Sequence, residues 1–144
     1  MSACDALRGV AVVAVTPGVR YMILCEDWGV DPINPRRVSI HGLLSTIRSL
    51  DQPPYPLLYR ELCVFLALTG GRATGTAQII CVFEETGQKI FGTPRREVAF
   101  GDDPLEVVGV AFRIQDCRFP YPGRYSIQFW YDDEQVEERP LLLR

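Results

Sequence analysis

The sequence predicts an all-β protein, specifically an antiparallel β-sandwich of seven to nine strands with Greek-key connections. Short apolar runs rich in β-branched and aromatic residues recur along the chain, and glycine, proline or aspartate separates them. Between these runs the sequence has no helical segment of a dozen residues, which disfavours a parallel α/β sheet. The length of 144 residues, without a repeat or linker, fits one domain over 1–144.

Each predicted strand is an apolar or alternating run that ends at a turn signal. The clearest turn signals are Gly101-Asp102-Asp103-Pro104 and the two glycines at 70–71. We expect 1–18 to be an N-terminal extension or an additional strand. The predicted strands cover 10–15, 19–25, 62–69, 76–85, 89–92, 96–100, 105–114, 125–131 and the terminal segment 135–144.

Two segments of the first half are less regular. Residues 28–37 contain two prolines and are predicted to form a loop, and 51–56 form an extended connector. Residues 38–50 start with the alternation of a strand, at Val38 and Ile40, and end with leucines at helical spacing. Both interpretations of 38–50 stay open.

The segment Gly123-Arg124-Tyr125 places a glycine two residues before a tyrosine at the start of a predicted strand. In immunoglobulin-like sandwiches this arrangement forms a tyrosine corner, in which the tyrosine hydroxyl bonds to upstream backbone. Ile127 stands where antibody domains have their second cysteine, which excludes an antibody-type disulfide. Gly123 and Tyr125 are therefore predicted to be structural residues of an immunoglobulin-like antiparallel β-sandwich.

Composition argues against several functional classes. The net charge of −3 disfavours a nucleic-acid-binding surface. No apolar run approaches the length of a membrane span, and the N-terminal residues lack the pattern of a signal peptide. Five cysteines without C-x-x-C spacing and a single histidine favour reduced thiols in the cytoplasm over a zinc site. We expect no cofactor.

The glycine-rich stretch "TGGRATG" at 69–75 raises the possibility of a phosphate-binding loop. Such loops require a helix N-terminus after the glycines, whereas a β-branched run follows here. We predict a hairpin turn at this position.

A cysteine-dependent enzyme is one alternative function. Cys25 stands beside two carboxylates and a tryptophan, and His41 is the sole histidine that could act as its base. The sequence does not show that the two residues meet. A buried thiol next to a solvated turn is the preferred interpretation.

Calcium binding is a second alternative. The acidic turns at Asp102-Asp103 and at Asp132-Asp133-Glu134 could share a calcium ion if they lie at the same end of the sandwich. Aspartate is also a favoured turn residue, so no metal site is predicted.

Trp130 lies on the opposite face of its strand from the apolar residues and shares that face with Gln128. An outward-facing tryptophan is typical of a partner-binding surface. Trp130 and Gln128 are therefore candidate contacts for a protein partner or a second copy of the chain. The alternative is that another segment covers the indole.

The segments "RYMILCED" (20–27), "RVSIHGL" (37–43), "LCVFLALTGGR" (62–72) and "FPYPGRYSI" (119–127) resemble a family of small bacterial proteins of unknown function. The resemblance covers about 19–144 and implies an immunoglobulin-like β-sandwich, without any catalytic residue. The sequence thus favours a non-enzymatic protein-binding or scaffold module.

Overall fold

The computed structural model describes residues 15–144. This part of the chain forms ten strands and no helix, so the all-β prediction is confirmed and the predicted number of strands is too low. The predicted strand over 10–15 lies outside the described residues except for Val15, which forms an isolated bridge with Arg72. The strands are β1 (Gly18–Val30), β2 (Val38–Leu43), β3 (Thr46–Ile47), β4 (Leu57–Thr69), β5 (Thr74–Phe83), β6 (Gln88–Gly92), β7 (Arg96–Ala99), β8 (Val107–Phe119), β9 (Gly123–Tyr131) and β10 (Glu134–Leu143).

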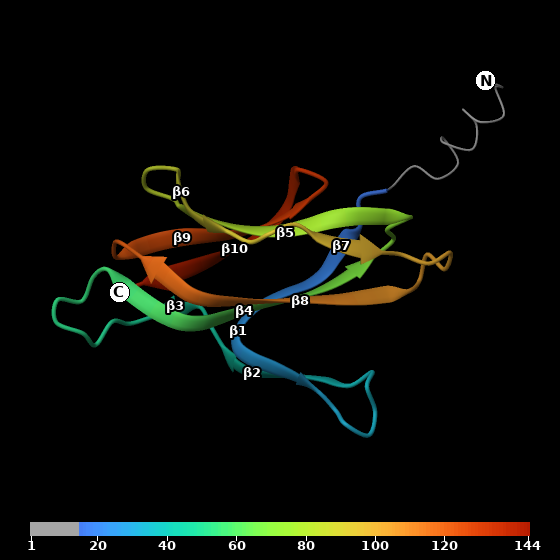
Figure 1. The fold of residues 1–144 in the computed structure, drawn as a ribbon, viewed down its shortest axis with the longest axis horizontal. Coiled ribbons are helices and arrows are strands. Elements are labelled where there is room, and N and C mark those ends of the chain that lie inside the picture. Colours follow the sequence, from blue (N-terminus) through green and yellow to red (C-terminus); the bar gives the residue numbers. More distant parts are fainter. Residues whose placement is uncertain (1–14) are drawn as a thin grey trace.

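The strands form two sheets that face each other (Figure 1). The first sheet has the order β2-β1-β4-β8, and the second has the order β3-β10-β9-β5-β6, with β7 also paired to β5. All pairs are antiparallel except β3 with β10. β8 is therefore an edge of the first sheet, and β6 and β7 form an edge of the second.

The core follows from the period-two alternation of side chains along strands. On β9, Tyr125, Ile127, Phe129 and Tyr131 are fully buried, as the sequence predicts. On β4 the inward positions are Leu62, Val64, Leu66 and Leu68, and these residues share one apolar cluster with those of β9. Both sheets thus contribute to a single core.

The segments that the sequence left ambiguous are mostly strand. Residues 38–43 form β2, which pairs with β1, and Thr46–Ile47 pairs with the end of β10. The prediction that all of 28–37 is loop is wrong, because β1 continues to Val30. Cross-strand pairing with β2 extends β1, and a local sequence pattern does not contain that information.

The glycine-rich stretch 69–75 is not a hairpin turn. β4 ends at Thr69 and β5 begins at Thr74, but β4 belongs to the first sheet and β5 to the second. The stretch therefore connects the two layers. Gly71 is required at a close approach, because a β-carbon there would lie 2.5 Å from the ring of Phe100.

Tyr125 makes the contacts of a tyrosine corner. Its hydroxyl donates a hydrogen bond of 2.7 Å to the carbonyl of Tyr121 and accepts one of 3.2 Å from the Tyr121 amide. Gly123 adopts φ +132°, and a β-carbon there would lie 3.0 Å from the ring of Phe83. The corner fixes the entry of the chain into β9.

Candidate functional site

A groove of about 570 Å³ lies on one open side of the two-layer structure. It lies between the edge of the first sheet and the edge of the second, and it is lined by 90–96 and 111–118. Its walls are therefore β8 on one side and the β6–β7 segment on the other. Figure 1 shows β8 and β7 in the two facing layers.

Aromatic contacts bridge the two walls of the groove. Phe91 of β6 packs edge-on against Phe119 of β8, with 6.1 Å between the ring centroids. Farther along, the guanidinium of Arg96 lies over the ring of Phe112, 5.8 Å from its centroid. The same guanidinium donates a hydrogen bond of 2.5 Å to the carbonyl of Ala111. The groove thus combines an aromatic contact between its walls with a cationic contact at the edge of β8.

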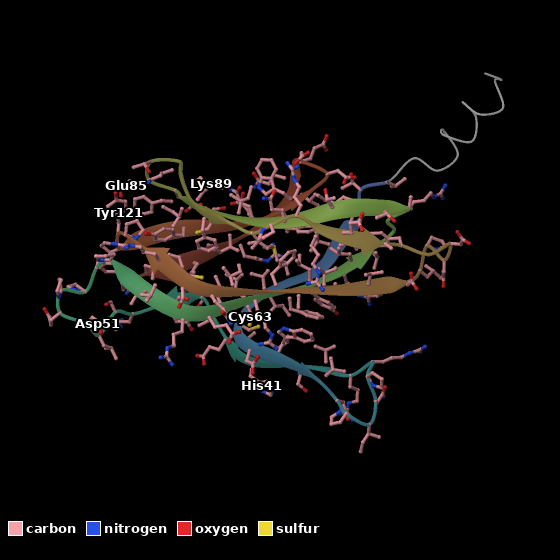
Figure 2. The ribbon with its side chains drawn as sticks, viewed as in Figure 1. His41, Asp51, Cys63, Glu85, Lys89 and Tyr121 are labelled. Carbon is pink, nitrogen blue, oxygen red and sulfur yellow. The ribbon has the colours of Figure 1, made fainter. Side chains whose placement is uncertain are left out.

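The structure does not support the pairing of Cys25 with His41. Cys25 is 0 % exposed, whereas His41 is exposed on β2. The strand partner of His41 is Asp27, and that of Cys25 on β2 is Leu43. Among the described residues no hydrogen bond joins the thiol and the imidazole. Figure 2 shows His41 on β2, the edge strand of the first sheet, away from the space between the two sheets.

Cys25 instead lies opposite Cys63 of β4. Burial, with a smaller contribution from Cys63, raises the pKa of the Cys25 thiol to about 11. Burial likewise raises the pKa of Cys63, and it raises that of Cys117 to about 12. Cys81 is also buried, and burial raises its pKa. These thiols stay protonated at neutral pH and behave as small apolar side chains rather than nucleophiles.

Arg113 of β8 is the strand partner of Cys63, and its side chain contacts the end of β1. It forms an ion pair of 2.5 Å with Asp27 and donates a hydrogen bond of 2.8 Å to the carbonyl of Trp28. Its guanidinium lies 5.1 Å from the Trp28 ring centroid, and that ring contacts Phe65. The hydrogen bond from Arg113 holds the pKa of the Asp27 carboxyl below its usual range. The residues around Cys25 thus form a structural cluster.

The acidic turns use their carboxylates within the chain. Asp132 accepts a hydrogen bond of 2.9 Å from the Thr76 amide, and Asp133 forms an ion pair of 2.6 Å with Arg95. Both residues have positive φ, so the turn before Glu134 is a tight hairpin. Asp103, next to Asp102, accepts a hydrogen bond from the Leu105 amide.

No group of three potential metal-ligating side chains is found within 15–144. Figure 1 also shows the loop after β7 well apart from the β9–β10 turn. The structure therefore keeps the two acidic turns apart.

Trp130 points to the outer face of the second sheet and is half-buried. Its indole N–H donates a hydrogen bond of 2.9 Å to the side chain of Gln128, which in turn bonds to Ser126. The two candidate partner-binding residues thus lie together, as predicted. Both are already engaged in a row of hydrogen bonds along β9, so the structure offers no free indole N–H here.

Comparison with known proteins gives a family but no activity. The profile of a family of unknown function, DUF6941, matches residues 20–144. The chain belongs to this family. No curated protein matches the chain. Among the solved structures that match is one described as Pseudomonas fluorescens alkylpurine DNA glycosylase AlkC bound to DNA containing an abasic site analog, with a TM-score of 0.48 and 14% identity. That match covers 89% of this chain and 30% of the other, and it carries no argument about function.

The DUF6941 chain has a candidate site that its sequence pattern did not reveal. The groove residues include Arg95, Arg96, Arg113 and Arg118, which are spread over two segments of an acidic protein. In the sequence, the feature that could have indicated this site is the adjacent pair of arginines at 95–96 together with the arginines within β8. No helix long and apolar enough to cross a membrane is found in the described part of the chain.

Proposed function

We propose that the protein is a non-enzymatic protein-binding module that captures an extended polypeptide segment by adding it as a strand to the edge of β8. The observation that carries this proposal is the outer edge of β8, which pairs with no strand of residues 15–144 and lines the groove of about 570 Å³ between the two sheets. Extended peptides commonly bind proteins in this way, because backbone hydrogen bonds supply affinity and adjacent pockets supply specificity.

The other sheet edges are less suited to strand addition. β2 has six residues and contains Gly42 at φ +68°. β10 has a register shift and Pro140, and β3 covers its end. Pro94 separates β6 from β7. Proline, bulges and short strands protect edges against pairing. β8 is thirteen residues long without proline, and its residue with positive φ, Asp116 at φ 55°, lies after the segment Gly109–Gln115.

The hydrogen bond from Arg96 shows which backbone groups of β8 face the groove. The Ala111 carbonyl points away from β4, since it accepts this bond from β7. In an antiparallel ladder alternate residues direct their amide and carbonyl groups to the same side. The backbone amide and carbonyl groups that point away from β4, as the Ala111 carbonyl does, are therefore also those of Gly109, Arg113 and Gln115. These four residues could pair with a peptide of about eight residues, which spans roughly 27 Å.

We also propose that the fold is an immunoglobulin-like sandwich and that the protein is cytoplasmic. The tyrosine corner at Tyr125 supports an immunoglobulin-like sandwich. The four described cysteines are free thiols, which supports a cytoplasmic location.

The test uses two fluorescein-labelled eight-residue peptides, one of alternating valine and glutamate and one of alternating valine and glutamine. Each is also made with N-methyl groups on the odd or on the even residues, which removes alternate amide donors. Fluorescence anisotropy should show binding of at least one parent peptide, and one methylated set should lose binding while the other retains it. Amides of Gly109, Ala111 and Gln115 should become protected from hydrogen exchange. Equal effects of both methylated sets, or no binding by either parent, would refute strand addition.

A further inference from the structure

Resting on the proposed strand addition, we infer that the groove selects an acidic segment, with carboxylates on alternate residues, and that Arg96 is its main recognition residue. The charge of the groove and the present partners of its arginines point to this chemical class of ligand.

The groove has the opposite charge to the rest of the protein. Four arginines and one aspartate are among its lining residues. The ion pairs of Arg95 with Asp133 and of Arg113 with Asp27 leave Arg96, Arg118 and Asp116, a formal charge of +1, whereas the whole chain has a net charge of −3. A surface of one sign in a protein of the other sign favours a ligand of complementary charge. Both walls contribute arginines, so a segment lying between them meets positive charge on each side.

Two of these arginines are already neutralised and two are not. Arg95 is paired with Asp133, and Arg113 is paired with Asp27 and lies 3.7 Å from Glu61. No carboxylate within 15–144 forms an ion pair with Arg96 or Arg118. Both side chains are exposed. They are the groove cations that remain available to a ligand.

The Arg96 guanidinium lies where the backbone of a bound strand would pair with β8. The guanidinium covers the Ala111 carbonyl, one of the acceptors on the free edge of β8. A guanidinium binds a carboxylate more strongly than a neutral carbonyl, because both partners are then charged. An incoming carboxylate would draw Arg96 away and leave the Ala111 carbonyl free for a ligand amide. Arg96 thus protects the edge in the absence of a ligand and recognises the ligand when it arrives.

A second copy of the chain is a poor occupant of the same edge. Antiparallel pairing of β8 with β8 of another copy would bring Arg118 of both copies, which forms no ion pair within 15–144, to one sheet. Like charges placed opposite each other across strands destabilise pairing. The charge of the edge therefore favours an acidic peptide over self-association.

The experiment compares the valine–glutamate peptide with its glutamine and lysine analogues by anisotropy at low and high salt. We expect the glutamate peptide to bind about tenfold or more tightly than the glutamine peptide, since a charge-assisted hydrogen bond is worth roughly that factor. Arg96→Gln should abolish this preference, and it should leave binding of the glutamine peptide unchanged or strengthen it, because the Ala111 carbonyl is then uncovered. Arg36→Gln, an equal charge change in the exposed loop after β1, is the matched control and should have no effect.

The outcomes separate the inference from the proposed function. Equal binding of the glutamate and glutamine peptides, with dependence on the methylated register, would overturn the acidic preference and keep strand addition. Absence of binding by every peptide would overturn both. Binding of a ten-residue thymidine oligonucleotide more tightly than the glutamate peptide, with loss in Arg96→Gln, would show a general polyanion site and overturn the inference. A preference for glutamate that survives in Arg96→Gln would exclude Arg96 as the recognition residue.

Discussion

Removing the hydroxyl of Tyr125 should destabilise the protein, whereas removing that of Tyr131 should not. Both side chains are 0 % exposed, and both belong to the core face of β9. The Tyr125 hydroxyl makes two hydrogen bonds to the backbone of Tyr121, at 2.7 and 3.2 Å. The Tyr131 hydroxyl is buried without a hydrogen-bond partner in the described part of the chain. The two Tyr→Phe variants thus remove the same atom from two equally buried sites.

The expected magnitude follows from these contacts. A net contribution of about 1 kcal/mol for each hydrogen bond gives a loss of about 1–2 kcal/mol for Tyr125→Phe. That loss corresponds to a fall in melting temperature of about 2–8 °C for a domain of this size. Burial of an unpaired hydroxyl is itself unfavourable. Tyr131→Phe should therefore be neutral or stabilising by up to about 1 kcal/mol.

Urea denaturation monitored by circular dichroism measures both free energies of unfolding. The slope of the free energy against urea should be the same for both variants and the parent, since neither changes the buried area much. Equal destabilisation by the two variants would show that packing of the phenol oxygen, rather than hydrogen bonding, determines stability here. A loss of less than about 0.3 kcal/mol in Tyr125→Phe would show that the corner is not a stabilising contact.

Three further predictions concern packing, thiols and metal. Gly75→Ala should destabilise by about 1–3 kcal/mol, because its β-carbon would lie 2.2 Å from the Tyr131 hydroxyl, whereas Gly29→Ala, with nothing within 4 Å, should be neutral in the same urea titration. In a Cys4→Ser variant the remaining four thiols should react with Ellman's reagent at pH 8 only after denaturant is added, because burial raises their pKa values. Rapid reaction of the native protein would contradict this prediction. Millimolar calcium should leave the melting temperature unchanged, since Asp132 already accepts a hydrogen bond from backbone; an increase of several degrees would disprove it.

The part of the fold that could be predicted from sequence depends on local periodicity. Alternation at Tyr125, Ile127, Phe129 and Tyr131 identifies the buried face of β9, because successive side chains of a strand point to opposite sides. Turn residues such as Gly87, at φ +74°, mark where strands end. The predicted glycine–tyrosine arrangement likewise specifies a contact between residues only four apart.

The candidate site could not be predicted, because it depends on pairings between distant residues. The stretch 69–75 looks like a hairpin turn, yet it joins different sheets, since local turn chemistry does not determine which strands pair. Cys25 and His41 are close in sequence, but the register of β1 with β2 and β4 places the thiol beside Cys63.

The sequence by itself therefore determined the class of structure, the inward-facing side chains and the tyrosine corner, all of which arise from contacts within a few residues. The tertiary structure decided which strands became edges, which arginines found carboxylates and which did not. Arg96 and Ala111 meet across two sheets, and this contact exists because strand order is set by the packing of the whole core.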